Sequence, residues 1–139
     1  MNAPKVVPCV GALVYDWRAR LLLIRRANEP GRGLWSLPGG RAEAEETLAE
    51  AMVREVLEET GLVVTAGPVV GRVERDGPGG MVYAITDFAA TPVSGELRAG
   101  DDADDARFVS AEELDHLPLS PGLYDALRGW DALPSRADH

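Results

Sequence analysis

Three glutamates spaced for one face of a helix are the residues of this sequence best suited to chemistry. Glu55, Glu58 and Glu59 stand at positions i, i+3 and i+4, which a helix of 3.6 residues per turn brings side by side. Like charges at this spacing repel, and they lie near a helix C-terminus, where the helix dipole favours cations. A hard divalent cation such as Mg²⁺, which takes oxygen ligands, would offset the repulsion. A solvated acidic helix face is the alternative interpretation.

A longer pattern surrounds these glutamates. It consists of Gly40, Glu46 and the run Arg54-Glu55-Val56-Leu57-Glu58-Glu59-Thr60-Gly61-Leu62. The segment resembles the signature of the Nudix hydrolases at every specified position, and the flanking runs Leu37-Pro38-Gly39-Gly40 and Phe108-Val109-Ser110 also look like that family. The resemblance implies an enzyme that hydrolyses a nucleoside diphosphate linked to another moiety. It also implies an α/β/α sandwich with a mixed sheet between helices, whereas spacing alone supports only an α+β or α/β class.

The resemblance assigns the metal ligands by position. It implies that Glu55, Glu58 and Glu59 hold Mg²⁺, with Mn²⁺ as a substitute, and that one of the three doubles as general base; which one stays open. The carbonyl of Gly39 or Gly40 would complete the metal shell. A turn followed by a helix entry is the alternative use of these two glycines, and the two roles are compatible.

Arg54 and Glu46 complete the expected catalytic set. By resemblance, Arg54 orients and partly neutralises the carboxylates, and Glu46 supports that arrangement. An ordinary surface ion pair is the alternative for both. A Nudix-like domain that binds ligands without catalysis is a second function class, but such a domain has no need to retain every carboxylate, and this chain retains them all.

A further metal ligand is expected from an acidic stretch outside the motif. Asp101, Asp102, Asp104 and Asp105 precede the expected strand 107–110, where many relatives have an acidic loop. Asp102 is the first choice as an additional ligand and Asp105 the second. A solvated acidic loop is the alternative.

Substrate contacts are expected from arginines in an otherwise acidic chain. Arg25 and Arg26 end an apolar run, and guanidinium groups pair bidentately with phosphate oxygens; exposed strand ends are the alternative. Pro78 follows Leu62 at a spacing that resembles the ADP-ribose pyrophosphatases, which favours ADP-ribose or a related nucleotide sugar. The run Arg25-Arg26-Ala27 resembles MutT-like enzymes, which keeps an oxidised deoxynucleoside triphosphate as the alternative substrate.

Composition limits the partners. The chain has 139 residues, 45% of them hydrophobic, which fits one domain spanning 1–139 with a flexible tail at 134–139. A net charge of −9 argues against binding to nucleic acid polymers or anionic membranes. A single cysteine, Cys9, and no signal or membrane-spanning run favour a cytoplasmic protein. We expect a small nucleotide as the partner, and a homodimer stays open.

Periodicity and turn residues predict the elements that position these side chains. Residues 6–15 and 21–24 are predicted to form a β-hairpin, 34–37 a short strand, and the motif helix to run from about Glu45 to a terminating Gly61. Residues 63–75 and 81–90 are predicted strands. Ser110 and Glu113 form a capping-box pattern for a helix over 111–117, and a last helix is predicted over 121–130.

Overall fold

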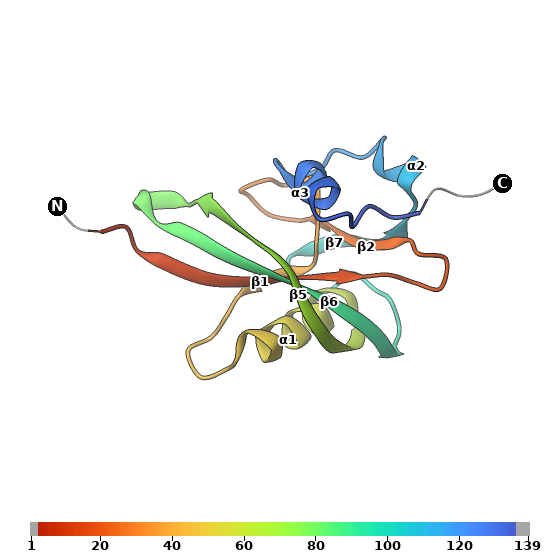
Figure 1. The fold of residues 1–139 in the computed structure, drawn as a ribbon, viewed down its shortest axis with the longest axis horizontal. Helices are drawn as coiled ribbons and strands as arrows, with labels where there is room; N and C mark the ends of the chain where they lie inside the picture. Colours follow the sequence, from red (N-terminus) through yellow and green to blue (C-terminus); the bar gives the residue numbers. More distant parts are fainter. Residues whose placement is uncertain (1–2, 136–139) are drawn as a thin grey trace.

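The structure, a computed structural model, describes residues 3–135 and contains two β-sheets flanked by helices (Figure 1). The larger sheet has the order β4-β1-β6-β5 and the smaller β3-β2-β7. The elements are β1 (Val6–Val14), β2 (Leu21–Arg26), β3 (Trp35–Ser36), β4 (Gly39–Arg41), α1 (Leu48–Thr60), β5 (Leu62–Asp76), η1 (Pro78–Gly80), β6 (Val82–Gly95), β7 (Ala103–Val109), α2 (Ala111–Leu114) and α3 (Leu123–Gly129). Because β1 runs parallel to β6 and antiparallel to β4, the larger sheet is mixed. The expected fold class is confirmed.

The layers follow from two apolar clusters, one on each face of the larger sheet. α1 packs its buried residues Ala51, Met52 and Val56 against one face of that sheet. The other cluster joins β1, the smaller sheet and the helices α2 and α3. Figure 1 accordingly shows α1 below the sheet and α3 above it. The sheet is therefore covered on both sides, as an α/β/α arrangement requires.

The predicted hairpin of β1 and β2 is wrong. Between them there is only an isolated bridge from Tyr15 to Leu21 within residues 3–135; β1 pairs with β4 and β6, whereas β2 pairs with β3 and β7. The reason is that residues 9–14 and 21–24 are buried on both faces, so each strand takes the centre of its own sheet. The turn at Asp16 carries the chain from one sheet to the other, with its carboxylate accepting from the backbone N–H groups of Arg18 and Arg20.

The motif helix starts later than predicted but ends where expected. Thr47 is the N-cap: its hydroxyl accepts from the Glu50 N–H, and the Glu50 carboxylate accepts from the Thr47 N–H. This capping box, visible in the sequence as Thr-x-x-Glu, fixes the start at Leu48 instead of Glu45. Gly61 adopts φ +77° and its N–H donates to the Leu57 carbonyl, so the predicted glycine terminus is confirmed.

The remaining elements agree with the predictions apart from their bounds. β5 and β6 form the long predicted pair, and Ser110 caps α2 with Glu113 as predicted, although α2 ends at Leu114. β7 begins at Ala103, four residues earlier than expected, because it pairs along the whole of β2. β7 therefore contains Asp104 and Asp105. The prediction that these two residues belong to a loop is wrong.

None of the helices over residues 3–135 is long and apolar enough to cross a membrane.

Two predictions on the chain's extent stay open. Most of the predicted flexible tail, residues 136–139, lies outside the described residues. The single domain over 1–139 stays a prediction.

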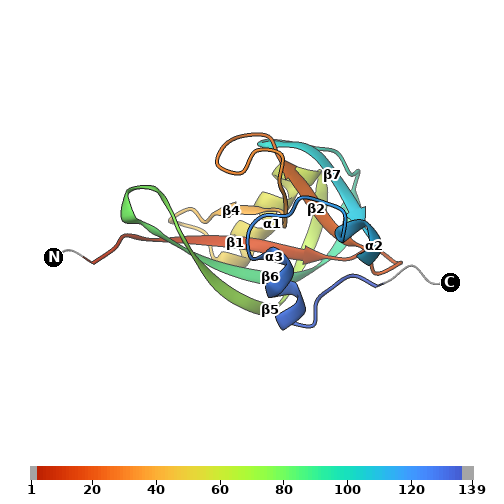
Figure 2. The same cartoon turned by 90° about the horizontal axis from the view of Figure 1, so that it is seen from above.

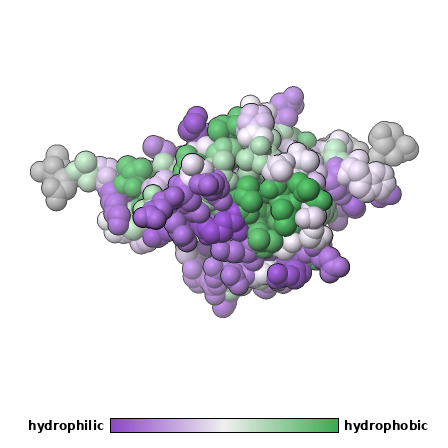
Figure 3. All heavy atoms as spheres, turned by 90° about the horizontal axis from the view of Figure 1, so that it is seen from below, coloured by the Kyte–Doolittle hydropathy of each residue, from purple (hydrophilic) through white to green (hydrophobic). Residues whose placement is uncertain are grey.

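Seen from the side that carries α1, the surface has a hydrophilic region beside an apolar one (Figure 3).

Candidate active site

Arg54 gathers the acidic side chains at one end of the site. Its Nη2 lies 2.6 Å from Glu46 Oε1 and its Nε 3.0 Å from Glu46 Oε2, a bidentate pair. Its Nη1 donates to Glu55 at 2.9 Å and to Glu58 at 3.1 Å, and its Nη2 also donates to the carbonyl of Arg41. The hydrogen bonds from Arg54 lower the pKa of Glu46 to about 2. One guanidinium therefore touches three of the predicted carboxylates.

Glu59 lies at the other end of the site and has no such partner. Its side chain is buried, with 7% of the residue exposed, and its Oε1 accepts from the Gly39 N–H at 2.7 Å. Burial is the largest cause that raises the pKa of Glu59, to about 8; the Gly39 N–H opposes the rise, and the charges of Glu55 and Asp102 add to it. The folded chain thus keeps a carboxyl where a negative charge is costly.

The paired glycines allow this close approach. A Cβ on Gly40 would lie 2.7 Å from the carboxylate carbon of Glu55, and a Cβ on Gly39 would collide with the Val10 carbonyl. Burial raises the pKa of Glu55, against the hydrogen bond from Arg54 that lowers it. Gly39 and Gly40 therefore allow the backbone to lie against the carboxylates. The expected turn and helix entry is wrong for these two glycines, because they lie in β4 and α1 starts only at Leu48. The carbonyl ligand stays a prediction.

The donor set suits a hard divalent cation, although the side-chain tips do not yet converge. Over residues 3–135, no three Asp, Glu, His or Cys side chains are arranged to hold a metal ion. Glu55 and Glu58 turn to Arg54 while Glu59 turns to Gly39, because like charges separate toward different donors. All the groups offered are carboxylate or carbonyl oxygens, the ligands that Mg²⁺ and Mn²⁺ take.

Asp102 is the member of the acidic stretch that lies near the site. It has a positive φ of +61°, accepts from Asn28 Nδ2 at 3.1 Å and raises the pKa of Glu59 by its charge. Asp105 pairs instead with Arg107 at 2.9 Å, chiefly through a hydrogen bond that lowers the pKa of Asp105. The structure brings the first choice, and not the second, to the buried glutamate.

The two arginines predicted to bind phosphate also differ in how close they lie to Glu59. Arg25 forms an ion pair with Asp104 and lies over the Trp35 ring, with its Cζ 5.6 Å from the ring centroid. Arg26 lowers the pKa of Glu59 by its charge, and its Nε donates to the Pro30 carbonyl. Only Arg26 of the pair therefore lies close enough to act on the buried carboxylate.

Two polar residues near the sheet were missed by the sequence reasoning. Asn28, in the loop after β2, contacts Asp102, but nothing in its surroundings marks it out. Asp87 lies within β6 and is 4% exposed. A lone carboxylate inside the apolar run of residues 82–90 was the available signal for Asp87.

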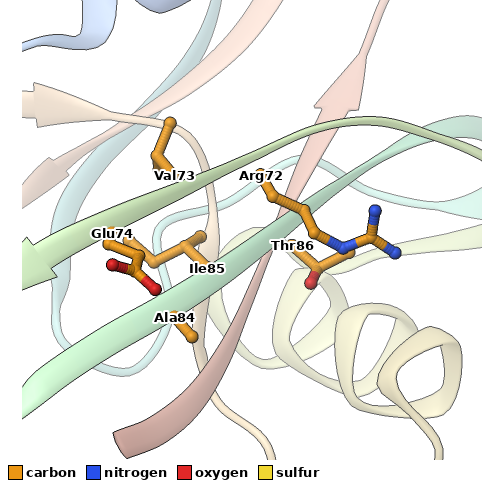
Figure 4. Close-up of a pocket in the computed structure, with 6 residues that line it drawn as sticks. All are labelled: Arg72, Val73, Glu74, Ala84, Ile85 and Thr86. Carbon is orange, nitrogen blue, oxygen red and sulfur yellow. The ribbon is translucent and has the colours of Figure 1, made fainter.

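A shallow cavity lies away from these carboxylates. It has a volume of about 140 Å³ and lies on the β5–β6 pair, lined by Arg72, Val73, Glu74, Ala84, Ile85 and Thr86 (Figure 4). None of the predicted site residues lines it.

The comparison with known proteins identifies the family. The NUDIX domain model matches residues 5–129. This chain belongs to the Nudix family. Its fold agrees with the MutT protein from Methanosarcina mazei Go1, with a TM-score of 0.81 and 27% identity over 94% of this chain and 96% of that one. Nudix hydrolases act on small nucleotide substrates and generally use a divalent metal.

Two of the similar proteins carry different named activities. The ADP-ribose pyrophosphatase of Methanocaldococcus jannaschii is 44% identical over 102 residues, which is 71% of this chain and 57% of that protein. The CTP pyrophosphohydrolase of Escherichia coli is 30% identical over 133 residues, 93% of this chain and 94% of that protein. The chain thus spans little more than half the length of the first relative and nearly all of the second.

Proposed function

We propose that this Nudix chain is a metal-dependent pyrophosphohydrolase that cleaves a nucleoside diphosphate linked to another moiety. The observation that carries the proposal is Glu59, a buried carboxyl on α1. Arg54, on the same helix, pairs with Glu46 and makes no hydrogen bond to Glu59 within residues 3–135. A divalent cation beside Glu59, Glu55 and Glu58 would supply the missing charge.

The reaction explains why these residue types stand together. A bound Mg²⁺ or Mn²⁺ would polarise the phosphoryl oxygen and lower the pKa of a bound water. Arg54 holds Glu55 and Glu58 in orientation, and Glu46 fixes the Arg54 guanidinium from the other side. The backbone of Gly39 and Gly40 lies against the carboxylates, and a carbonyl of one of them would complete the metal shell.

The residues around the three glutamates would adjust the charge of the site and bind the substrate. Asp102 adds a carboxylate beside Glu59, and Arg26 adds a guanidinium for a phosphate oxygen. Arg25, expected to share that role, is paired with Asp104 and would have to leave this partner to reach a phosphate. The general base, one of the three glutamates, stays unassigned.

ADP-ribose or a related nucleotide sugar is the proposed substrate class. The support is the identity to the M. jannaschii ADP-ribose pyrophosphatase. The position of Pro78 does not add support, because this proline lies exposed in the η1 turn, where proline is common for conformational reasons alone. An oxidised deoxynucleoside triphosphate is the second candidate, favoured by the overall similarity to the M. mazei MutT protein. A homodimer and a cytoplasmic location stay predictions.

A substrate panel tests the proposal. The rate constant kcat/KM is measured with Mg²⁺ and Mn²⁺ for ADP-ribose, nucleotide sugars, CTP, and normal and oxidised deoxynucleoside triphosphates, because this ratio reports differential transition-state binding. We expect ADP-ribose to exceed the triphosphates by more than about a hundredfold, since a pocket that binds the terminal ribose leaves polar groups unpaired without it.

Two outcomes contradict the proposal at different levels. A preference for a triphosphate overturns the substrate class and leaves the hydrolase in place. Absence of turnover on every member, with tight binding of one, replaces the enzyme by a nucleotide-binding module.

A further inference from the structure

Asp87 is a buried carboxylate with no use in the site described above. It is 4% exposed, and it accepts no hydrogen bond from any residue of 3–135. Over the same residues no buried side-chain oxygen lacks a partner, so the Asp87 oxygens keep contact with solvent. The guanidinium of Arg75 is the nearby charge that favours its ionised form. Because no residue of 3–135 donates to them, the Asp87 oxygens are available to accept a hydrogen bond from a ligand.

Glycines flank Asp87 on both neighbouring strands. The register of the larger sheet places Gly11 of β1 and Gly71 of β5 directly beside it. A Cβ on Gly11 would collide with Asp87 Oδ1, and a Cβ on Gly71 would collide with the indole ring of Trp130. The two glycines therefore admit a carboxylate and an aromatic ring to the same face of the sheet.

Beyond Asp87 the same face becomes a half-exposed shelf. The shelf consists of the cross-strand pairs Ile85 with Val73 and Tyr83 with Arg75, which share the face of Asp87 because side chains alternate along a strand. The guanidinium of Arg41 lies over the Tyr83 ring, with its Cζ 5.4 Å from the centroid. Seen from above, no helix or strand of residues 3–135 covers the β5–β6 turn beyond it (Figure 2). An apolar and aromatic floor beside one acceptor suits a planar heterocycle.

The shelf lies within reach of the carboxylates. Gly39, whose N–H binds Glu59, pairs with Gly11, and Gly11 pairs with Asp87. Two strand spacings, about 10 Å, therefore separate Gly39 from Asp87. This separation is comparable with the span of a nucleoside between its phosphate and the far edge of its base.

We propose that Asp87 determines base specificity by accepting a hydrogen bond from the exocyclic amine of the substrate's purine. The inference rests on the proposed function, which supplies the nucleotide. A carboxylate accepts and cannot donate, so it selects an amine over a hydrogen or a carbonyl at the same position.

Binding without turnover tests this inference apart from catalysis. Isothermal titration in metal-free buffer compares AMP with purine riboside 5′-monophosphate, and GMP with IMP, because each pair differs by one amine. The wild type is expected to bind the amine-bearing member of at least one pair about tenfold or more tightly. Asp87→Ala should reduce that ratio to below about twofold, because it removes both acceptor oxygens.

Matched variants separate recognition from folding. Glu74→Gln, an exposed change on the opposite face of the same strand pair, should keep the wild-type ratio. Asp87→Val, which also lacks an acceptor, serves if Asp87→Ala does not fold. Equal binding within both pairs, no binding of any of the four nucleotides, or a ratio that survives the loss of Asp87 overturns the inference. Because no hydrolysis is measured, failure of the substrate panel leaves this result standing, and the reverse also holds.

Discussion

The two ends of the carboxylate site differ in the group that stabilises the negative charge of the glutamates. At one end Arg54 grips Glu46 bidentately and reaches Glu55 and Glu58, and the pKa of Glu46 falls to about 2. At the other end Glu59 has the Gly39 N–H as its hydrogen-bond donor, and burial raises its pKa to about 8. The same residue type is thus stabilised as an anion at one end and penalised at the other.

This difference indicates where a metal belongs. A single guanidinium cannot serve all the carboxylates, and Glu59, which it does not reach, is buried where an anion needs a cation. We therefore propose that Arg54 holds the carboxylates of its end in place, and that the Glu59 end would hold the divalent ion.

The largest expected effect comes from removing the charge at the Glu59 end. Glu59→Gln keeps an oxygen for the Gly39 N–H but removes a metal ligand, so kcat with Mg²⁺ should fall by about two to three orders of magnitude. In metal-free buffer at pH 7 the variant should melt at a higher temperature, because no buried carboxyl remains to be charged.

The control for this change is Glu43→Gln, an exposed glutamate whose carboxylate lies 3.9 Å from Arg54. It should turn over at the wild-type rate. Wild-type activity in Glu59→Gln, or a loss as large in Glu43→Gln, contradicts the distinction between the two ends.

The next effect comes from the Arg54 end and concerns folding. Arg54→Met keeps much of the side-chain volume but leaves Glu46 and Glu55 without their shared guanidinium, so the free energy of unfolding should fall by about 2 kcal/mol. Arg128→Met, which breaks an exposed ion pair with Asp125 at 3.5 Å, should cost less than about 0.5 kcal/mol. Urea unfolding in metal-free buffer measures both. Equal losses in the two variants would show that the Arg54 network is only a surface ion pair.

A smaller effect distinguishes Asp87, the buried carboxylate outside this network. Burial raises the pKa of Asp87 from 3.8 to about 6, against the opposing charge of Arg75. The folded state therefore keeps its proton to higher pH than the unfolded chain, and the stability that this proton provides is lost as pH rises from about 4 through about 6. Relative to wild type, Asp87→Asn should gain about 1–2 kcal/mol between pH 4 and pH 7.

Thermal unfolding across that pH range measures the difference, in which the other titrating groups cancel. Asp76→Asn, an exposed change in the same strand pair, should show no such trend. A constant difference between Asp87→Asn and wild type contradicts the assigned shift.

The smallest expected effect tests the acidic stretch. Asp102→Asn should raise the Mg²⁺ concentration for half-maximal rate by about tenfold or less, because Asp102 lies outside the three glutamates. Asp105→Asn should behave as wild type, since Asp105 pairs with Arg107. Equal, negligible changes in both would return Asp102 to the solvated surface.

The sequence predicted the parts of this molecule that local chemistry controls. The motif gave the fold class and the Glu46–Arg54 contact, and Gly61 marked the end of α1 through its positive φ. The Ser110 capping box located α2 because its hydrogen bonds lie within four residues. Each of these features depends on neighbours in the chain or on a motif that specifies them.

The sequence failed where long-range pairing decides. β1 and β2 looked like a hairpin, yet each pairs with strands far along the chain. The acidic stretch looked like one loop, but pairing with β2 draws Asp104 and Asp105 into β7 and leaves Asp102 beside Glu59. Asp87 stood out in the sequence only as a carboxylate within an apolar run, and its place beside Gly11 depends on the pairing of β6 with the distant strand β1.

We propose that the Glu59 end of the site, and not the Arg54 end, requires a divalent cation. Isothermal titration of Mn²⁺ into metal-free wild type, Glu59→Gln and Glu43→Gln distinguishes the two ends. We expect Glu59→Gln to weaken the tightest Mn²⁺ site by at least about tenfold, while Glu43→Gln binds Mn²⁺ as the wild type does. Unchanged Mn²⁺ affinity in Glu59→Gln would rule out a cation at the Glu59 end.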